Sequence, residues 1–218
     1  MSTLETLFVD AANQKSDINE HIFTLYEYTK FCESVLELGV RDCVSSWAFL
    51  KGLMDNNKET KRLICNDLKK SRQIDRLLDI SKEVGCDTVF FAENDLDLDL
   101  GGENVDLCFI DTWHVYGQLK RELEKFAPIT RKYIVMHDTE VDRVYGESLR
   151  CGLNIVSQAK ISGFPEDEIK QGLGRAISEF LELHPEWSIE LEKKNNNGLT
   201  VLKRKDIKKK KEQHIHIL

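Results

Sequence analysis

The stretch SVLELGVRDC, residues 34–43, has the composition of a buried strand that ends in a tight turn. Residues 35–38 are apolar apart from Glu37, and Gly39 allows the backbone to turn sharply and to approach a ligand closely. After the turn, apolar residues recur at helical spacing, at Trp47, Leu50, Leu53 and Met54. The side chains expected to cap this helix are Asp42, Ser45 or Ser46. The stretch therefore predicts a strand, a glycine turn and a helix.

The same alternation continues along the chain. Further apolar runs predict strands at residues 62–66, 88–92, 106–110 and 133–136. Amphipathic helices are predicted between them, with apolar faces that begin at Ile74 and at Tyr116. Strands that are apolar on both faces and alternate with helices are typical of a parallel sheet covered on both sides.

The two ends of the chain differ from this pattern. Residues 4–32 are predicted to be helical, and another helix is predicted from Pro165 to Phe180. Two short strand-like runs, residues 187–191 and 199–202, flank an Asn-Gly turn, which is a strong signal for a hairpin. We therefore predict an α/β fold with a Rossmann-like, doubly wound, seven-stranded sheet, mostly parallel and finished by a C-terminal antiparallel hairpin.

The domain organisation follows from the same reading. Residues 1–204 are expected to form a single domain, in which residues 1–32 are an N-terminal helical cap. The Lys-rich residues 205–218 are expected to be a flexible basic tail. The apolar N-terminal helix could pack on its own sheet or on a second subunit, so a homo-oligomer stays open.

The composition limits the partners that the chain is expected to bind. A formal net charge of −7 is unfavourable for nucleic acid, because phosphate binding needs a basic surface. No stretch approaches the roughly 20 apolar residues of a membrane span, and the acidic N-terminus does not resemble a secretory signal. The six cysteines are spread singly, which favours a reducing, cytoplasmic compartment over a disulfide framework.

Polar residues follow the predicted strands, at the edge where doubly wound sheets bind their ligands. Gly39 lacks the further glycines of a dinucleotide fingerprint, which favours a ligand without pyrophosphate, although an ordinary strand-to-helix turn is the alternative. Asp67 could accept hydrogen bonds from ribose hydroxyls or simply cap a turn. Glu93 and Asn94 end the third strand, where an adenine edge would lie. The Asp-rich loop after them, residues 95–99, lacks the spacing of a calcium loop.

Two clusters of His and Asp follow the fourth and fifth strands. Asp111 and His114 come after one strand, and His137 and Asp138 come after the other. Adjacent strand ends place all four around one crevice. His is the usual side chain for proton transfer near neutral pH, whereas His and Asp together could instead hold a divalent metal.

Three segments resemble a known family. VLELGVRDCVSSW, residues 35–47, resembles the E-x-G-x-x-x-G motif with which class I methyltransferases bind S-adenosylmethionine (SAM). FIDTWHVY at 109–116 and HDT at 137–139 are similar to a pattern of the subgroup that includes cephalosporin-hydroxylase-like proteins and sugar O-methyltransferases. The end, residues 184–204, resembles the last hairpin of that subgroup. The matches run in order from about residue 33 to 204.

The resemblance implies a role for individual residues. Those implied to bind SAM are Glu37, Gly39, Arg41, Ser45, Asp67, Glu93, Asn94 and Asp111. The implied catalytic residues are Asp111, His114 and His137, and either histidine is a candidate general base. In metal-using members Mg²⁺ is bound by carboxylates that map to Asp111 and Asp138.

Two departures from the family pattern affect these implied roles. Cys43 stands where the first motif has its last glycine, which perturbs the loop next to SAM. Thr112 and Trp113 replace a common Gly-Asp pair, which removes a carboxylate from the implied metal site.

The function that we expect is methyl transfer from SAM to a hydroxyl of a sugar or glycan, with a rhamnose-like deoxysugar as one candidate. Trp113, Tyr116 and Tyr145 could offer ring faces to a sugar, although core packing explains Tyr116 equally well. The alternatives are a phenolic or other small-metabolite acceptor and a non-catalytic module with the same fold. The His and Asp clusters speak against the last, because a scaffold has no use for them.

Overall fold

The computed structural model describes residues 2–205, which form a seven-stranded sheet in the order β3-β2-β1-β4-β5-β7-β6. The strands are β1 (Ser34–Leu38), β2 (Arg62–Asp67), β3 (Asp87–Ala92), β4 (Val105–Ile110), β5 (Thr130–His137), β6 (Trp187–Lys193) and β7 (Leu199–Arg204). The first five are parallel, and β7 is antiparallel to both β5 and β6. The predicted fold, with its C-terminal hairpin, is confirmed. The strand order reverses between β1 and β4, where ligands bind in such sheets.

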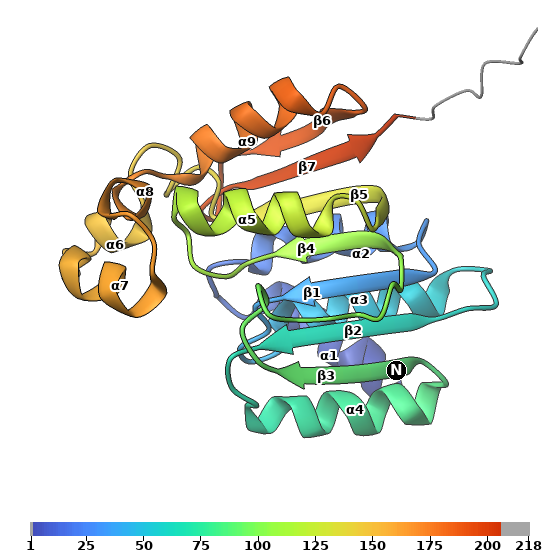
Figure 1. Cartoon of the computed structure of the whole chain (residues 1–218). Helices are drawn as coiled ribbons and strands as arrows, with labels where there is room; N and C mark the ends of the chain where they lie inside the picture. Colours follow the sequence, from blue (N-terminus) through green and yellow to red (C-terminus); the bar gives the residue numbers. More distant parts are fainter. Residues whose placement is uncertain (1, 206–218) are drawn as a thin grey trace, which may run out of the picture.

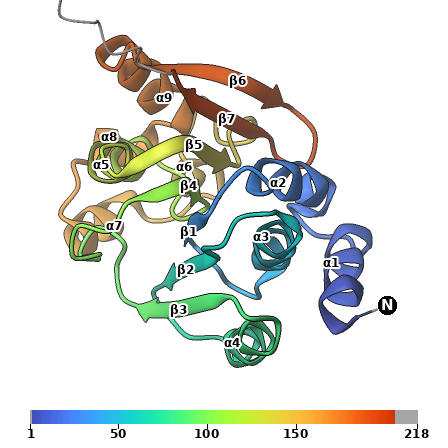
Figure 2. The same cartoon turned by 90° about the vertical axis from the view of Figure 1, so that its right-hand side faces the viewer.

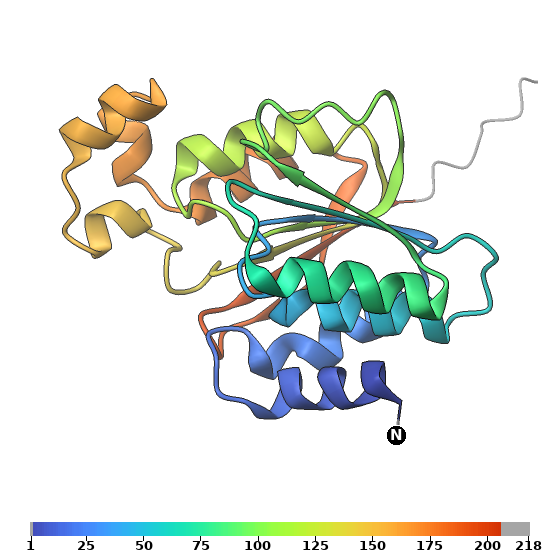
Figure 3. The same ribbon diagram turned by 90° about the horizontal axis from the view of Figure 1, so that it is seen from below.

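Helices cover both faces of the sheet (Figures 2 and 3). One face carries α1 (Thr3–Asn13), α2 (Ile22–Thr29), α3 (Val44–Asp55) and α4 (Arg72–Val84). The other carries α5 (Tyr116–Phe126) and α9 (Leu173–Leu183). Successive side chains of β1 enter different cores, because Val35 packs with α1–α4 whereas Leu36 packs with α5 and α9.

The N-terminal region is not one continuous helical segment. Residues 14–18 separate α1 from the short 3₁₀ helix η1 (Asn19–His21), which leads into α2. The Asn19 side chain accepts a hydrogen bond from the Ser16 amide and donates one to the Ala12 carbonyl. Short polar side chains of this kind compete with helical hydrogen bonds, which explains the break.

Three short helices lie beyond the carboxyl ends of the parallel strands (Figure 1). They are α6 (Glu147–Arg150), α7 (Ile155–Ser162) and α8 (Glu166–Lys170), and we call residues 147–170 the outer helices. An isolated antiparallel β-bridge between Tyr145 and Gln171 joins the two ends of this segment. The prediction of one helix from Pro165 to Phe180 is wrong, because the segment is divided into α8 and α9. At the division a Cβ on Gly172 would lie 2.2 Å from the Asp142 carbonyl oxygen, so a tight tertiary approach overrides the helical pattern.

Two of the remaining expectations concern the C-terminus and the membrane. The predicted basic tail, apart from Lys205, lies outside the described residues. Among residues 2–205, no helix combines the length and the apolar character that crossing a bilayer requires.

Candidate active site

A cavity of about 950 Å³ opens at the carboxyl ends of β1–β4, between the sheet and the outer helices. Six of the residues predicted to bind the cofactor line it: Gly39, Arg41, Asp67, Glu93, Asn94 and Asp111. Its other walls include Leu68, Asp95, Asp97 and Trp113 near the strands and Glu147, Gln158, Ile161 and Phe164 from the outer helices and the loops beside them. The cavity therefore lies at the reversal of strand order, as the sequence predicts.

Gly39 makes the crossing between β1 and β4 possible. Its φ of +83° is one that only glycine adopts easily, and a Cβ there would lie 1.9 Å from the Asp111 carbonyl oxygen. The Gly39 amide donates to the Asn66 carbonyl, and the Asp111 amide donates to the Leu38 carbonyl. The turn is thus fixed against both neighbouring strands.

The rest of the turn keeps a glycine-like backbone without glycines. Cys43, at the position of the missing motif glycine, has a φ of +63°, and Arg41 has a φ of +43°. Asp67 supports this conformation, since its Oδ2 accepts hydrogen bonds from the Val40 amide at 3.0 Å and the Arg41 amide at 2.9 Å. Asp67 therefore caps the turn and also lines the cavity, and its predicted role in binding a ribose stays a prediction.

Glu37 and Ser45 lie beneath the turn and do not line the cavity. Glu37 is fully buried, and it accepts hydrogen bonds from Ser45 Oγ at 2.5 Å and Ser46 Oγ at 2.7 Å. Burial raises the pKa of Glu37 to about 7. The expected cap of α3 is also wrong: Cys43 is its N-cap residue, and both serines bind Glu37 instead. Glu37 therefore contacts the start of α3 rather than the cavity.

The structure brings Asp111, His114, His137 and Asp138 together in one cluster. Asp111 Oδ1 lies 3.1 Å from His114 Nε2 and 3.3 Å from His137 Nδ1. Asp138 Oδ2 lies 3.1 Å from His114 Nδ1 and 3.5 Å from His137 Nδ1. Asp111 also lines the large cavity, so it connects this cluster to the predicted cofactor space.

Both histidines are held as hydrogen-bond donors to carboxylates. Burial by itself would lower the pKa of His137, but the hydrogen bonds and charges of Asp111 and Asp138 raise it to about 10. The pKa of His114 is raised for the same reason, and that of Asp111 is lowered despite its burial. His137 Nε2 donates to the Asn196 carbonyl at 3.2 Å, so both of its ring nitrogens are engaged. In this arrangement Asp111, not either histidine, faces the cavity as an unprotonated group.

The same cluster has the donors of a cation site. One ligand atom each from Asp111, His114 and Asp138 lies within 4.8 Å of the others. Asp138 Oδ1 is buried and has no hydrogen-bond partner among the described residues, as a vacant ligand atom would. The donors therefore fit a divalent cation. A nitrogen donor beside two carboxylates suits Mn²⁺, Fe²⁺ or Zn²⁺ better than Mg²⁺, which prefers oxygen ligands.

None of the predicted site residues belongs to the outer helices, although residues of this segment contact the site. Glu147 lies on the cavity wall with Oε2 3.6 Å from His114 Nδ1, and Phe164 stacks on Trp113 with ring centroids 5.8 Å apart. No motif marks this region, since its position depends on the fold. Of the three proposed aromatic faces, only Trp113 lines the cavity; Tyr116 is buried in the core, and Tyr145 is exposed.

Solved structures share this fold. The fold is that of the class I methyltransferases, with the strand order β3-β2-β1-β4-β5-β7-β6. The O-methyltransferase TomG from Streptomyces achromogenes, solved with SAM, is 12% identical with a TM-score of 0.57, over 94% of this chain and 91% of that chain. An O-methyltransferase from Bacillus cereus, solved with S-adenosylhomocysteine (SAH), is 16% identical with a TM-score of 0.53, over 94% and 91%.

A third structure extends the likeness to a fungus. The SAH-bound methyltransferase PaMTH1 of Podospora anserina is 18% identical with a TM-score of 0.51, over 94% of this chain and 89% of that chain. In sequence, the chain matches no family model and no curated protein. At these identities the likeness establishes the fold, and the activity has to be argued from the site.

Proposed function

We propose that the protein is a SAM-dependent O-methyltransferase that acts on a hydroxyl of a small acceptor. One observation carries the proposal: Asp111 lies both on the wall of the cavity at the strand reversal and in the His-Asp cluster. A cofactor in that cavity and an acceptor beside the cluster would therefore meet at Asp111. The SAM and SAH found in the similar structures support the choice of cofactor.

The charge and the polar groups of the cavity walls suit SAM. The turn at Gly39 and Arg41 would face the methionine end, Asp67 the ribose, and Glu93 and Asn94 the adenine. The cavity is rich in carboxylates, and its Arg41 already pairs with Asp17. A negative wall favours the sulfonium cation of SAM over neutral SAH, which aids release of the product.

The reaction is an in-line displacement at the methyl carbon. The acceptor oxygen forms the new C–O bond as the C–S bond breaks, and the electron pair of that bond stays on sulfur, which gives SAH. Attack by a neutral hydroxyl makes the oxygen strongly acidic as the bond forms, so even a carboxylate of low pKa can accept its proton. Asp111 is the group placed to take it, while His114 and His137 hold the carboxylate in position.

A divalent cation bound by Asp111, His114 and Asp138 would displace a ring proton from His114 and would stabilise developing alkoxide charge on the acceptor. Mg²⁺ on Asp111 and Asp138, as the family resemblance implies, remains part of the proposal. The donor set favours a transition metal.

A sugar or glycan is the acceptor that we propose first. Trp113 offers an aromatic surface, and Glu147 and Gln158 of the outer helices offer hydrogen-bonding groups in the same cavity. A ring face flanked by polar acceptors suits a sugar, which has both apolar CH faces and hydroxyl edges. A small aromatic metabolite is the second candidate, favoured by the stacked pair of Trp113 and Phe164. The TomG protein, involved in tomaymycin synthesis, is an example of a small-molecule enzyme with this fold.

A methylation screen tests the proposal. Purified protein is incubated with SAM and a panel of sugars, glycans and phenols, and products are detected by a mass increase of one methylene. We expect a product that depends on both SAM and a hydroxylated acceptor. Loss of activity after EDTA, restored by Mn²⁺ better than by Mg²⁺, would support the cation site, and activity unaffected by EDTA would remove it. SAM-independent modification would contradict the proposed function.

A further inference from the structure

His21, in the N-terminal region, is buried beside the His-Asp cluster and does not itself line the cavity. Its side chain is fully buried, and its Nε2 lies 3.0 Å from the Asn195 carbonyl oxygen and 3.2 Å from that of Asn196. The Asn196 carbonyl also accepts the hydrogen bond from His137 Nε2, at 3.2 Å. The Asn196 carbonyl oxygen thus accepts hydrogen bonds from both histidines, and the ring centroids of the two histidines are 5.7 Å apart.

The turn that carries this carbonyl is tightly fixed. Asn196 and Asn197 both have positive φ, and a Cβ on Gly198 would lie 2.4 Å from the Glu140 amide nitrogen. The Asn197 carbonyl accepts hydrogen bonds from the amides of Glu140 and Val141, which follow β5. The turn of the β6–β7 hairpin therefore packs directly on the strand end that bears His137.

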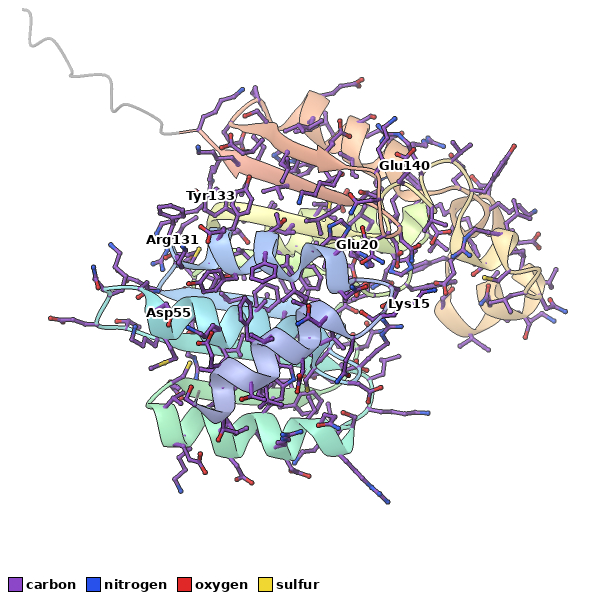
Figure 4. The ribbon with its side chains drawn as sticks, turned by 180° about the vertical axis from the view of Figure 1, so that it is seen from behind. Lys15, Glu20, Asp55, Arg131, Tyr133 and Glu140 are labelled. Carbon is purple, nitrogen blue, oxygen red and sulfur yellow. The ribbon has the colours of Figure 1, made fainter. Side chains whose placement is uncertain are left out.

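The N-terminal region is attached to the same turn by its side chains. Asn196 Oδ1 accepts a hydrogen bond from the Glu20 amide at 3.1 Å, and Asn196 Nδ2 donates to the Ser16 carbonyl at 2.9 Å. Figure 4 labels Glu20 on the side of the molecule covered by α1 and α2, and on the same side Glu140, which follows β5. Two segments about 175 residues apart in sequence thus meet next to His137 of the His-Asp cluster.

We propose that His21 is a positioning residue for the methyl transfer: through the Asn196 carbonyl it fixes the ring of His137, which in turn holds Asp111. This inference rests on the proposed function. Burial lowers the pKa of His21, so the ring is neutral and can donate from Nε2. Packing alone does not explain a histidine at this position. An apolar side chain of similar size would fill the same space without a hydrogen bond to the Asn195 or Asn196 carbonyl. The N-terminal region is then part of the reaction centre as well as a cover for the sheet.

The test compares two substitutions of His21. His21→Gln keeps a side-chain N–H donor, whereas His21→Leu keeps the volume without a donor. His184→Leu is the matched control, because His184 stacks on Phe180 and has no contact with the hairpin turn. The measured quantities are kcat with saturating acceptor, the Kd of SAM by calorimetry, and the ring ¹H–¹⁵N spectrum of His137.

We expect His21→Leu to lower kcat roughly 10- to 100-fold, as small misplacements of reacting groups do, with the Kd of SAM changed less than about threefold. His21→Gln should recover most of kcat, and the His137 ring signals should shift more in His21→Leu than in His21→Gln. Unchanged kcat and ring signals in His21→Leu would overturn the proposal, as would parallel losses of kcat and SAM affinity. If the protein bound no SAM, the proposed function would fall, but the His137 spectrum would still decide whether His21 positions that ring.

Discussion

Glu37 is a buried carboxyl group directly below the turn formed by residues 39–43. Its pKa is raised from an ordinary value near 4.5 to about 7 by burial. Between these values the folded protein holds a proton that the unfolded chain has lost, so the stability falls as pH rises from about 4.5 to 7. The decrease from this one residue is about 3 kcal/mol, from 1.36 kcal/mol for each pKa unit.

Glu37→Gln tests this effect. The variant has no proton to lose, so its free energy of unfolding should decrease less between pH 5 and pH 8 than that of the wild type. Urea unfolding at both pH values measures this change in the free energy of unfolding. The contributions of all other titrating groups cancel when the wild type is compared with the variant. An identical pH dependence in the two proteins would show that Glu37 ionises normally.

Asp111 is the residue on which the proposed chemistry depends most. Asp111→Asn removes the charge that holds two histidines and the group placed to accept the proton. We expect kcat to fall at least about 100-fold, the lower range for loss of a positioned base. Asp79→Asn, on the exposed face of α4, is the control and should keep its activity. Activity within tenfold of wild type in Asp111→Asn would exclude Asp111 as the proton acceptor.

The identity of the site residues was predictable from the sequence to a large extent, but their contacts were not. Gly39, Asp67 and Asp111 follow strands, and strand ends meet at one edge of a parallel sheet. The burial of Glu37 could not be predicted, because the side chain of that strand position turns toward α3 and its two serines. The sequence also could not predict that both ring nitrogens of His137 are hydrogen-bonded, since one partner is a backbone carbonyl about 60 residues away.

The turn after β1 passes close to the backbone of Asp111, the residue that follows β4. In Gly39→Ala the new methyl group would overlap the Asp111 carbonyl, and the backbone would be strained at a φ of +83°. We expect a loss of about 2–5 kcal/mol in the free energy of unfolding, together with loss of SAM binding. Chemical denaturation and calorimetry measure the two effects. Gly101→Ala, where φ is also positive but a Cβ would meet nothing, separates strain from overlap.

The outer helices are proposed to shape the acceptor half of the cavity. Phe164 stacks on Trp113, and the Arg121 guanidinium lies 4.1 Å from its ring centroid. Phe164→Ala should raise the KM of the acceptor about tenfold, because an aromatic contact of about 1–1.5 kcal/mol is lost. The Kd of SAM should stay within about threefold. A larger effect on SAM than on the acceptor would assign this wall to the cofactor.

The strands were easier to predict than the outer helices for a physical reason. A parallel strand with helices on both faces needs a mostly apolar run, and this local signal is present at all five parallel strands. The division between α8 and α9 depends on the approach of Gly172 to the Asp142 carbonyl, which no local pattern contains. The helix α7 has no buried residue, so it lacks the apolar periodicity by which helices are recognised.

At the scale of the whole molecule, the hairpin completes the sheet and the N-terminal region covers one face of it. The Asn-Gly signal was enough to predict the hairpin, but not that its turn would contact His21 and His137. The formal net charge of −7 and the carboxylates of the cavity both favour a cationic ligand. We therefore propose that this edge of the sheet binds SAM.

Isothermal titration calorimetry with SAM tests that claim most directly, because it requires no knowledge of the acceptor. We predict one binding site per chain with a Kd of about 1–100 μM, a range typical of enzyme substrates, and weaker binding in Asp67→Asn. SAH should bind at the same site. Absence of binding by both SAM and SAH at about 1 mM, with a protein that is folded by circular dichroism, would contradict the account.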